Sequence, residues 1–502
     1  MVSEYHVADG HKSAISHGRA RIVQARKESI SGSIHWKTKP IKKNRDGVHN
    51  KGSSPAAKRS CQGGTRRGAE WKLKPQNDIA SLFPQDLFSE EPRDRPLLMG
   101  YGIGPALVER VGMMPCADPL IATGIGSILA DALIGHRTGQ ATSFSLRKEN
   151  YVGLSHYHPA MTYRVVKMAV DHLGWLDLIE IEKGKSWAKG GKGRQSRFWA
   201  GDLLLDLAGG HPILQPRKDA PLLVMKDGEK NLIPYRTTDR TIAMTRDIRA
   251  QNEVLASADI RLDADDVEWI GDGFVSIPNA VKHGPHQGDA ITIRTDQTAL
   301  RRIANNGSWN EGMRFYGHYA QSLPKTRRQQ LTIGGMPVEL LDFGASHPAL
   351  LYGEYGLMID GDPYDIHGIE RGEAKLGLLI LVNASNRHQG IEAMAGKLAE
   401  VETGRGETVV IRQDHRVRAR AIFAAIERRH PTIAGSFCTG AGTKLQALES
   451  EIIAAVMRAA RKQGIVTVPV HDEVVVATKE AGIMRDLMVE KWVSACGAFP
   501  HL

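Results

Sequence analysis

The sequence predicts an α+β protein with more than one domain. The chain has 502 residues, which is too long for one compact core and long enough for two or three domains. Some stretches place apolar residues at spacings of three and four, which predicts helices, and others concentrate alternating or β-branched residues, which predicts strands. No internal repeat indicates a solenoid. We expect four regions: 1–95, 96–205, 206–330 and 331–502.

Residues 1–95 form a basic segment that we expect to be disordered. Residues 1–74 contain 17 Lys and Arg against 5 Asp and Glu, a net charge of +12, so the rest of the chain has a net charge of −2 and the overall +10 comes from this segment. Few aliphatic clusters offset the ordering entropy here. The run KTKPIKKNR (residues 37–45) can bind phosphates nonspecifically by counterion release. A solvated tail without a partner fits this composition equally well.

Cysteine usage and hydropathy predict a cytoplasmic protein with no membrane partner. Cys61, Cys116, Cys438 and Cys496 lack the close spacing of a zinc site or a small disulfide scaffold. No run approaches the roughly 20 apolar residues that span a bilayer. Charged residues also occupy the N-terminal stretch where a signal peptide would be apolar.

Residues 96–205 have the pattern of a winged helix. LIATGIGSILADAL (residues 120–133) and MTYRVVKMAVDHLGWLDLI (residues 161–179) have helical spacing. Residues 179–200 then read as a strand, a Gly/Lys-rich tip and a returning strand. Two helices followed by a basic two-stranded loop are typical of winged-helix domains.

The winged-helix interpretation places basic side chains against a phosphate backbone. The exposed helix and the wing would contribute Tyr163, Arg164, Lys167, Lys185, Lys189, Lys192, Arg194 and Arg197. DNA or RNA contact is the natural use of such a surface. Winged helices also dock proteins, and a basic hairpin can be no more than a soluble hairpin.

Residues 206–330 are predicted to connect the two better-defined regions. A turn at residues 226–230 predicts a hairpin between PLLVM and NLIPY, and residues 239–256 predict a capped helix. Residues 301–333 interleave cations with aromatics, so Arg314 and Tyr316 are candidate contacts to a nucleic-acid strand. Ordinary core aromatics beside a solvated basic turn would give the same pattern.

Residues 331–502 contain two aspartates in strand contexts. GMPVELLDFGASHPALLYGEYG begins as a strand that ends at Asp342, a position where an Asp is more often a cap or turn residue. IVTVPVHDEVVVAT predicts a hairpin with His471, Asp472 and Glu473 at its tip. Phosphoryl transfer with two metal ions needs carboxylates on neighbouring strands. Asp342 and Asp472 are therefore candidate ligands of Mg²⁺ or Mn²⁺.

Four motifs in this region resemble family A DNA polymerases. The VHDE turn after a long helix resembles motif C, and LLDFGASHPALL resembles a divergent motif A. In ERGEAKLGLLILVNA, Arg371 and Lys375 have the R-x-x-x-K spacing of the fingers helix, which puts both cations on one helix face. The resemblance implies a palm with fingers, in which this pair binds the triphosphate of a nucleotide.

The fourth motif, QALESEIIAAVM, is similar to the glutamine-bearing helix of that family, which implies that Gln446 contacts primer or template. His347 occupies the position of the glutamate that excludes ribose in the family, so sugar selectivity is open. Leu379 and Val382 replace an aromatic residue of the fingers helix. Asn383 is either a base or sugar contact or a helix cap. The short spacing between Asp342 and Asp472 implies reduced fingers.

The sequence thus predicts a winged-helix domain followed by a polymerase-type palm, an antiparallel sheet with helices. The expected activity is nucleotidyl transfer to a nucleic-acid 3′ end, with DNA and nucleoside triphosphates as partners. Glu473 would support the metal site, and His471 would either orient the primer terminus or pack within the turn. Two alternatives stay open: a catalytically decayed DNA-binding factor of a mobile element, and priming or untemplated addition. No proofreading exonuclease is expected.

Overall fold

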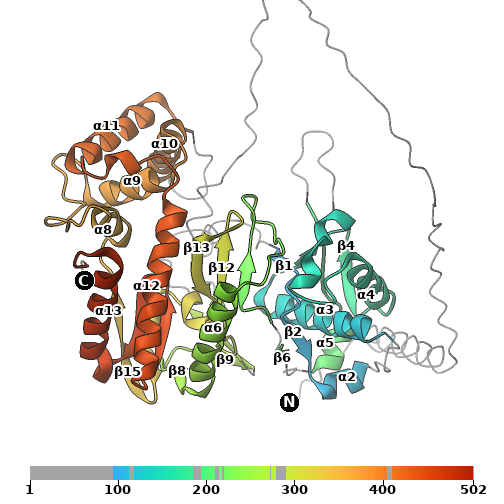
Figure 1. Cartoon of the computed structure of the whole chain (residues 1–502). Helices are drawn as coiled ribbons and strands as arrows, with labels where there is room; N and C mark the ends of the chain where they lie inside the picture. The colour runs from blue at the N-terminus through green and yellow to red at the C-terminus, as the bar shows by residue number, and fades with distance from the viewer. Residues whose placement is uncertain are drawn as a thin grey trace, which may run out of the picture.

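The protein is a mixed α+β structure with several antiparallel sheets. The computed structural model describes residues 94–111, 118–184, 194–209, 214–217, 220–271, 273–278, 290–403 and 410–500, so the basic segment lies outside it. Two large hydrophobic cores and one small cluster lie in the described chain. One large core includes residues from Met99 to Ala208, the other includes residues from Leu223 to Trp492, and the small cluster includes Met313. The elements of the two large cores form two units that lie beside each other (Figure 1).

The N-terminal unit packs its helices around a small mixed sheet. The helices are α2 (Pro105–Val111), α3 (Pro119–Thr138), α4 (Tyr163–Trp175) and α5 (Asp202–Ala208). The sheet has the order β1-β3-β5-β4, from β1 (Arg95–Pro96), β3 (Thr142–Phe144), β4 (Ile179–Glu182) and β5 (Ser196–Ala200). A separate pair joins β2 (Tyr101–Ile103) to β6 (Leu214–Pro216). The two predicted helices and the predicted pair of returning strands are confirmed.

Helix α3 is the central helix of this unit. Asp118 caps it by accepting the N–H of Leu120, and it ends at Gly139 in the left-handed conformation. It is long and apolar enough to cross a bilayer, but 67% of its apolar window is buried inside the protein. Its apolar character is therefore accounted for by packing, as expected of a core helix.

The C-terminal unit contains a five-stranded antiparallel sheet that joins segments far apart in the chain. Its order is β16-β17-β15-β14-β8. The strands are β8 (Ile260–Leu262), β14 (Leu331–Ile333), β15 (Met336–Asp342), β16 (Thr467–Val470) and β17 (Glu473–Ala477). The strand ending at Asp342 and the hairpin carrying Asp472 are thus confirmed. Strand β8 comes from the predicted connecting region, so that region contributes to the same sheet.

Two further three-stranded sheets complete the unit. One is β11-β10-β9, from β9 (Glu268–Gly271), β10 (Phe274–Pro278) and β11 (Ala290–Arg294), and the other is β13-β12-β7, from β7 (Leu223–Met225), β12 (Arg301–Asn305) and β13 (Ser308–Tyr316). The predicted hairpin at residues 226–230 is only a single bridge between Lys226 and Leu232. Strand β7 instead pairs in parallel with β12, a long-range contact that the local turn does not reveal.

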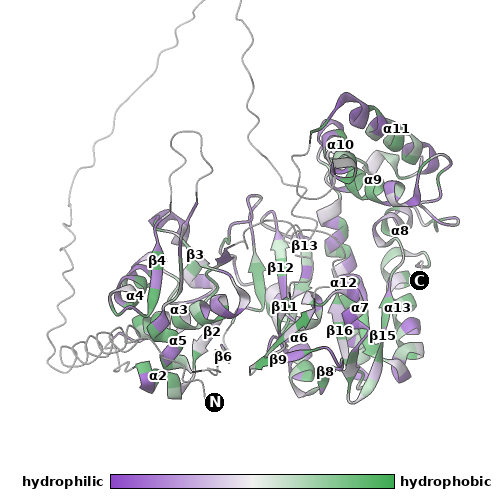
Figure 2. Ribbon diagram, turned by 180° about the vertical axis from the view of Figure 1, so that it is seen from behind, coloured by the Kyte–Doolittle hydropathy of each residue, from purple (hydrophilic) through white to green (hydrophobic). Residues whose placement is uncertain are grey.

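Helices cover these sheets and extend beyond them. They are α6 (Asp239–Ser257), α7 (Lys325–Arg328), α8 (Ser346–Gly353), α9 (Arg371–Asn383), α10 (Arg387–Thr403), α11 (Gln413–Arg429), α12 (Gly442–Lys462) and α13 (Ala481–Cys496). Helix α12 runs beside the sheets, and α9, α10 and α11 gather at one end of it (Figure 1). Hydrophobic residues concentrate on strands such as β16, and hydrophilic residues on outward turns of α11 (Figure 2).

The two units touch through a buried tyrosine. The hydroxyl of Tyr157 accepts the N–H of Met225 at 3.0 Å and also lies against the carbonyl oxygen of Ile233. Nearby, the guanidinium of Arg294 lies 4.0 Å from the ring centroid of Tyr101. These contacts fix the N-terminal unit beside strand β7.

Candidate catalytic carboxylate cluster

The two aspartates predicted as metal ligands lie at the same end of two neighbouring strands in the five-stranded sheet. Strand β15 ends at Asp342, which pairs in register with Glu473, the first residue of β17. Asp472 occupies the turn immediately before Glu473. Adjacent antiparallel strands are about 5 Å apart, so the backbones that carry the two aspartates are neighbours.

A third carboxylate, Glu449 on α12, lies beneath them. Its side chain is fully buried. Arg314 on β13 donates from Nε to Oε1 and from Nη2 to Oε2, both at 3.0 Å. His347 Nε2 lies 3.4 Å from Oε2. Burial acts to raise the pKa of Glu449, but His347 and Arg314 outweigh it and lower the pKa to about 2. Glu449 is therefore ionised at neutral pH.

Ser346 links this buried carboxylate to Asp472. Its Oγ lies 3.2 Å from Glu449 Oε2 and 3.2 Å from Asp472 Oδ2. A hydroxyl has one proton, so it donates to one carboxylate at a time. The preceding residue, Ala345, has φ of 50°, a left-handed conformation that costs a non-glycine residue about 1 kcal/mol or more. The chain accepts this strain where α8 begins at Ser346.

Both aspartates titrate above their ordinary range. The pKa of Asp472 is raised to about 6 by burial and then by the negative charges of Glu449 and Asp342. Desolvation raises the pKa of Asp342, as do Glu473 and Glu449, against the opposing charges of Lys325 and Lys375. Burial and the neighbouring carboxylates therefore outweigh the attraction of these two lysines.

Glu473 and His471 are positioned differently from Asp472. Glu473 is buried, and Arg328 Nε donates to it at 2.9 Å while Lys325 Nζ lies 3.5 Å away. Its charge is therefore already neutralised. His471 has φ of 61° and stacks edge-on against Tyr316, with the ring centroids 5.9 Å apart. Burial lowers the pKa of His471 to about 4, so its imidazole is neutral at pH 7.

The donor set fits a magnesium ion that retains other ligands. Within the described ranges, no group of three His, Cys, Asp or Glu converges as a metal cage. Mg²⁺ commonly uses one or two protein carboxylates and takes its other ligands from water and substrate phosphates. Asp342 and Asp472 supply such a pair, whereas Glu449 and Glu473 are both held by arginines.

The predicted nucleotide-binding pair lies on α9, close to a tyrosine whose pKa is affected by the charges of the two aspartates. Arg371 begins α9 and donates from Nε to Asp362 at 2.6 Å. Arg371 and Lys375 lie 5.3 and 6.0 Å from the ring centroid of Tyr364. Burial raises the pKa of Tyr364 to about 12, and the charges of Asp472 and Asp342 contribute to this shift. This side of α9 therefore lies within electrostatic range of the carboxylate cluster.

Two residues predicted to contact nucleic acid are largely enclosed in the fold. Gln446 is buried, three residues before Glu449 on α12, so both side chains lie on one face of that helix. Arg314 uses its guanidinium to hold Glu449. We therefore reassign Arg314 from strand contact to support of the cluster. Tyr316 is partly buried against His471.

Comparison with known protein families and with curated proteins finds no match. The assignment of this cluster consequently depends on its geometry and charge. Sequence reasoning missed Glu449, Ser346 and Tyr364. It counted Lys325 and Arg328 among the cations suited to a nucleic-acid strand, whereas in the structure both lie beside Glu473. Glu449 had a recognisable signal, because it occupies an apolar position of the spacing Leu445, Glu449, Ile452, Val456. A charged residue at such a position requires a buried partner.

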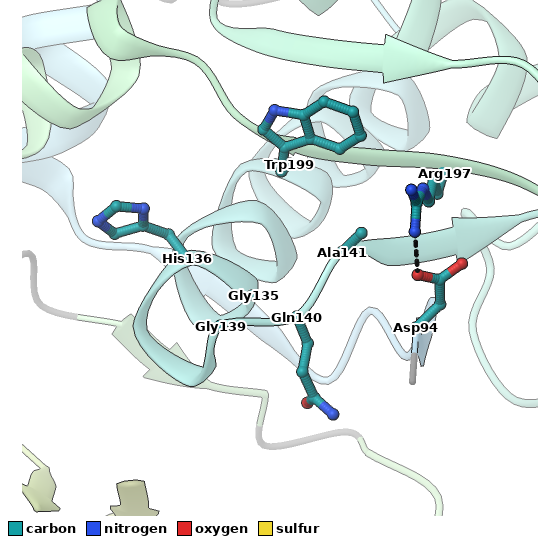
Figure 3. A pocket seen from close by; sticks show the side chains of 8 residues that line it. All are labelled: Asp94, Gly135, His136, Gly139, Gln140, Ala141, Arg197 and Trp199. Carbon is teal, nitrogen blue, oxygen red and sulfur yellow. Dashed lines mark hydrogen bonds and ion pairs between the residues drawn. The ribbon is translucent and has the colours of Figure 1, made fainter. Parts of the chain in front are cut away.

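The cations predicted on the winged-helix surface are mostly paired. Arg164 is 68% exposed and lies 3.7 Å from Asp118, and Lys167 pairs with Asp171 on the same helix. Arg194 and Arg197 share Glu182. Arg197 also pairs with Asp94 at 3.1 Å in a pocket of about 360 Å³, beside Trp199 and His136 (Figure 3). Lys185, Lys189 and Lys192 lie outside the described residues.

Proposed function

We propose that the C-terminal unit catalyses nucleotidyl transfer to the 3′ end of a nucleic acid, with Asp342 and Asp472 as ligands of Mg²⁺ or Mn²⁺. One observation carries the proposal. Asp342 and Asp472 lie at neighbouring strand ends, Ser346 joins Asp472 to the buried and ionised Glu449, and burial together with repulsion among the carboxylates raises the pKa of both aspartates. Ionising both aspartates there costs stability, and a bound cation would offset that cost.

A bound divalent ion would supply electrostatic stabilisation of the phosphate oxygens and activation of the attacking hydroxyl. The chain's own residues then have distinct tasks. Arg371 and Lys375 on α9 neutralise the triphosphate, with Tyr364 beneath them. Arg314 and Glu449 fix Ser346, which holds the Asp472 carboxylate in place. Arg328 fixes Glu473 and with it the start of β17.

We further propose that the units correspond to a winged helix and to a polymerase-type palm with small fingers. In support, α4 and the β4/β5 pair follow the order of a winged helix, and the five-stranded sheet carries both aspartates. Helices α9, α10 and α11 would form the fingers. DNA, as primer-template or single strand, is then the partner, and Gln446 and His347 lie close enough to the cluster to influence which end and which sugar are accepted.

The test is extension of labelled primer-templates and single strands by the full-length protein, with each nucleotide pool and with Mg²⁺ or Mn²⁺. We expect Asp342→Asn and Asp472→Asn to abolish extension. Glu339→Gln is the matched control, because Glu339 lies on the same strand β15 but pairs with Arg485 at the surface. Extension that survives Asp472→Asn contradicts the proposal.

A readout without turnover comes from metal binding. Mg²⁺ should raise the unfolding temperature of the wild-type C-terminal unit, because it binds only the folded cluster. The increase should be lost in Asp342→Asn and Asp472→Asn and retained in Glu339→Gln.

The alternative is a decayed palm that binds DNA without extending it. The ion pair between Arg371 and Asp362 favours it, since this arginine already has a carboxylate partner in the structure. DNA binding without extension or Mg²⁺-dependent stabilisation, under every nucleotide condition, would support this alternative.

A further inference from the structure

A groove rich in arginine lies between α6 and α12, outside the carboxylate cluster. The two helices lie side by side (Figure 1) and are joined by ion pairs. The groove has a volume of about 650 Å³. Its charged lining consists of five arginines and two acids, and the arginines are Arg240, Arg246, Arg302, Arg458 and Arg461.

The two acids do not neutralise the five guanidinium groups. Arg458 and Arg461 share one carboxylate, that of Asp247, at 3.1 and 2.6 Å. Arg302 is buried and pairs with Glu451 at 3.1 Å. The groove therefore keeps an excess of three positive charges.

The two remaining arginines are available for a ligand. Arg240 bonds only uncharged groups in the structure, the side-chain oxygen of Asn310 and the carbonyl of Trp309. Arg246 is exposed and makes no ion pair with any residue in the described part of the chain. Their guanidinium groups can thus meet an anion without losing a carboxylate partner.

Helix geometry separates this groove from the proposed catalytic centre. Glu449 and Glu451 are two residues apart on α12, which places them about 200° apart around the helix. Glu449 faces Arg314 and Ser346, while Glu451 faces Arg302 in the groove. A ligand in the groove is therefore not the reacting 3′ terminus or the incoming nucleotide.

The arginines of the groove lining favour a ligand with several consecutive phosphate groups. Guanidinium groups bind phosphate through paired N–H donors. The groove lining contains no aromatic side chain on which a base could stack, and its floor is built from aliphatic residues such as Ala243 and Ile248. From Arg240 to Ala250, α6 extends about 15 Å, enough for about four phosphates of one strand at roughly 3.4 Å each along a duplex.

We propose that this groove binds the phosphate backbone of double-stranded nucleic acid. The groove reads no bases, so binding is independent of sequence and depends strongly on salt. The inference goes beyond nucleotidyl transfer and does not require the cluster to be active. In a polymerase it would hold the duplex at a distance from the reacting end, and in a DNA-binding factor it would be a principal contact.

The test is arginine-selective dicarbonyl labelling of the full-length protein, read by mass spectrometry, with and without a duplex of about 20 base pairs and without metal. The duplex should lower labelling of Arg246 by about threefold or more at low salt and not at high salt. Arg420 is the control, because it is exposed on α11 and does not line the groove. Equal protection of both arginines, or protection of neither, overturns the proposal.

Three further comparisons make the result specific. Arg246→Glu should reduce duplex protection of Arg240, whereas Arg420→Glu should not. Polyglutamate is an acidic-protein probe, and protection of Arg246 by polyglutamate but not by duplex would overturn the proposal. Repeating the labelling with Asp472→Asn separates duplex binding in the groove from nucleotidyl transfer. The duplex should protect Arg246 in this variant as in the wild type, even though extension is lost.

Discussion

Replacing Arg314 with methionine should destabilise the C-terminal unit strongly. Arg314 makes two 3.0 Å hydrogen bonds to Glu449, a carboxylate with no solvent exposure. Methionine keeps much of the side-chain volume but leaves Glu449 with only Ser346 and His347. Removing one partner of a buried ion pair typically costs about 3 to 5 kcal/mol, because the other charge stays desolvated.

The pKa of Glu449 gives a magnitude for its partners together. His347 and Arg314 outweigh burial and lower this pKa from 4.5 to about 2, which corresponds to about 3 kcal/mol of stability at neutral pH, and loss of Arg314 removes part of it. Because the folded pKa is below the unfolded one, this contribution is present above pH 4.5 and is lost as the pH falls toward 2. The penalty of Arg314→Met should therefore be largest at pH 7 and should shrink as Glu449 becomes protonated.

Differential scanning calorimetry would measure this effect with an internal reference. The transition of the C-terminal unit should fall by about 6 °C or more at pH 7, while that of the N-terminal unit should not move. Arg485→Met is the matched control, since the pair of Arg485 on α13 with Glu339 on β15 lies in the same unit but is more exposed, and it should contribute less than about 1 kcal/mol. Glu449→Gln should partly rescue Arg314→Met. An equal effect of Arg314→Met and Arg485→Met would refute the reasoning.

Three further outcomes follow from other contacts. Asp472→Asn should raise the unfolding temperature of the metal-free protein at pH 7 and have no effect on it below about pH 4. The reason is that burial and Glu449 raise the pKa of Asp472 to about 6, so the ionised carboxylate destabilises the folded state only at higher pH. Destabilisation at pH 7 would contradict this. Tyr157→Phe should cost about 1 to 2 kcal/mol by leaving the N–H of Met225 unpaired, and should speed proteolysis between the two units; unchanged cleavage would argue against a role for this contact in docking. Gly442→Ala should destabilise α12 by about 1 to 3 kcal/mol, because the added Cβ overlaps the side-chain oxygen of Asn383. Adding Asn383→Ala to the same chain should restore stability. If calorimetry finds that Gly442→Ala is neutral, the Asn383 side chain moves freely.

The elements that carry the two aspartates could be predicted because their signals are local. The alternating residues before Asp342 and the β-branched runs on both sides of Asp472 each define a strand without reference to the rest of the chain. We expected the two strands to be neighbours because phosphoryl transfer with two metal ions needs both carboxylates close together. The helices at residues 120–133, 161–179 and 239–256 were likewise predicted by periodicity and capping.

The partners of the charged residues could not be predicted in the same way. Arg314 is more than a hundred residues from Glu449 in the chain, and nothing local distinguishes it from an arginine that faces solvent. Strand β7 pairs in parallel with β12 although the intervening turn favours a hairpin with its neighbour. In both cases a long-range contact overrides the local preference.

The pairing of β15 with β17 also affects how this protein is made. Asp342 and Glu473 are partners in the sheet but are about 130 residues apart in the chain. At about 5 to 20 residues per second, a ribosome needs roughly 6 to 26 seconds to synthesise that interval. Strand β15 can pair with β14 during that time, but its other edge has no partner. Nascent chains stalled before residue 473 should therefore depend on chaperones, and the aspartate pair forms only after strand β17 has been synthesised.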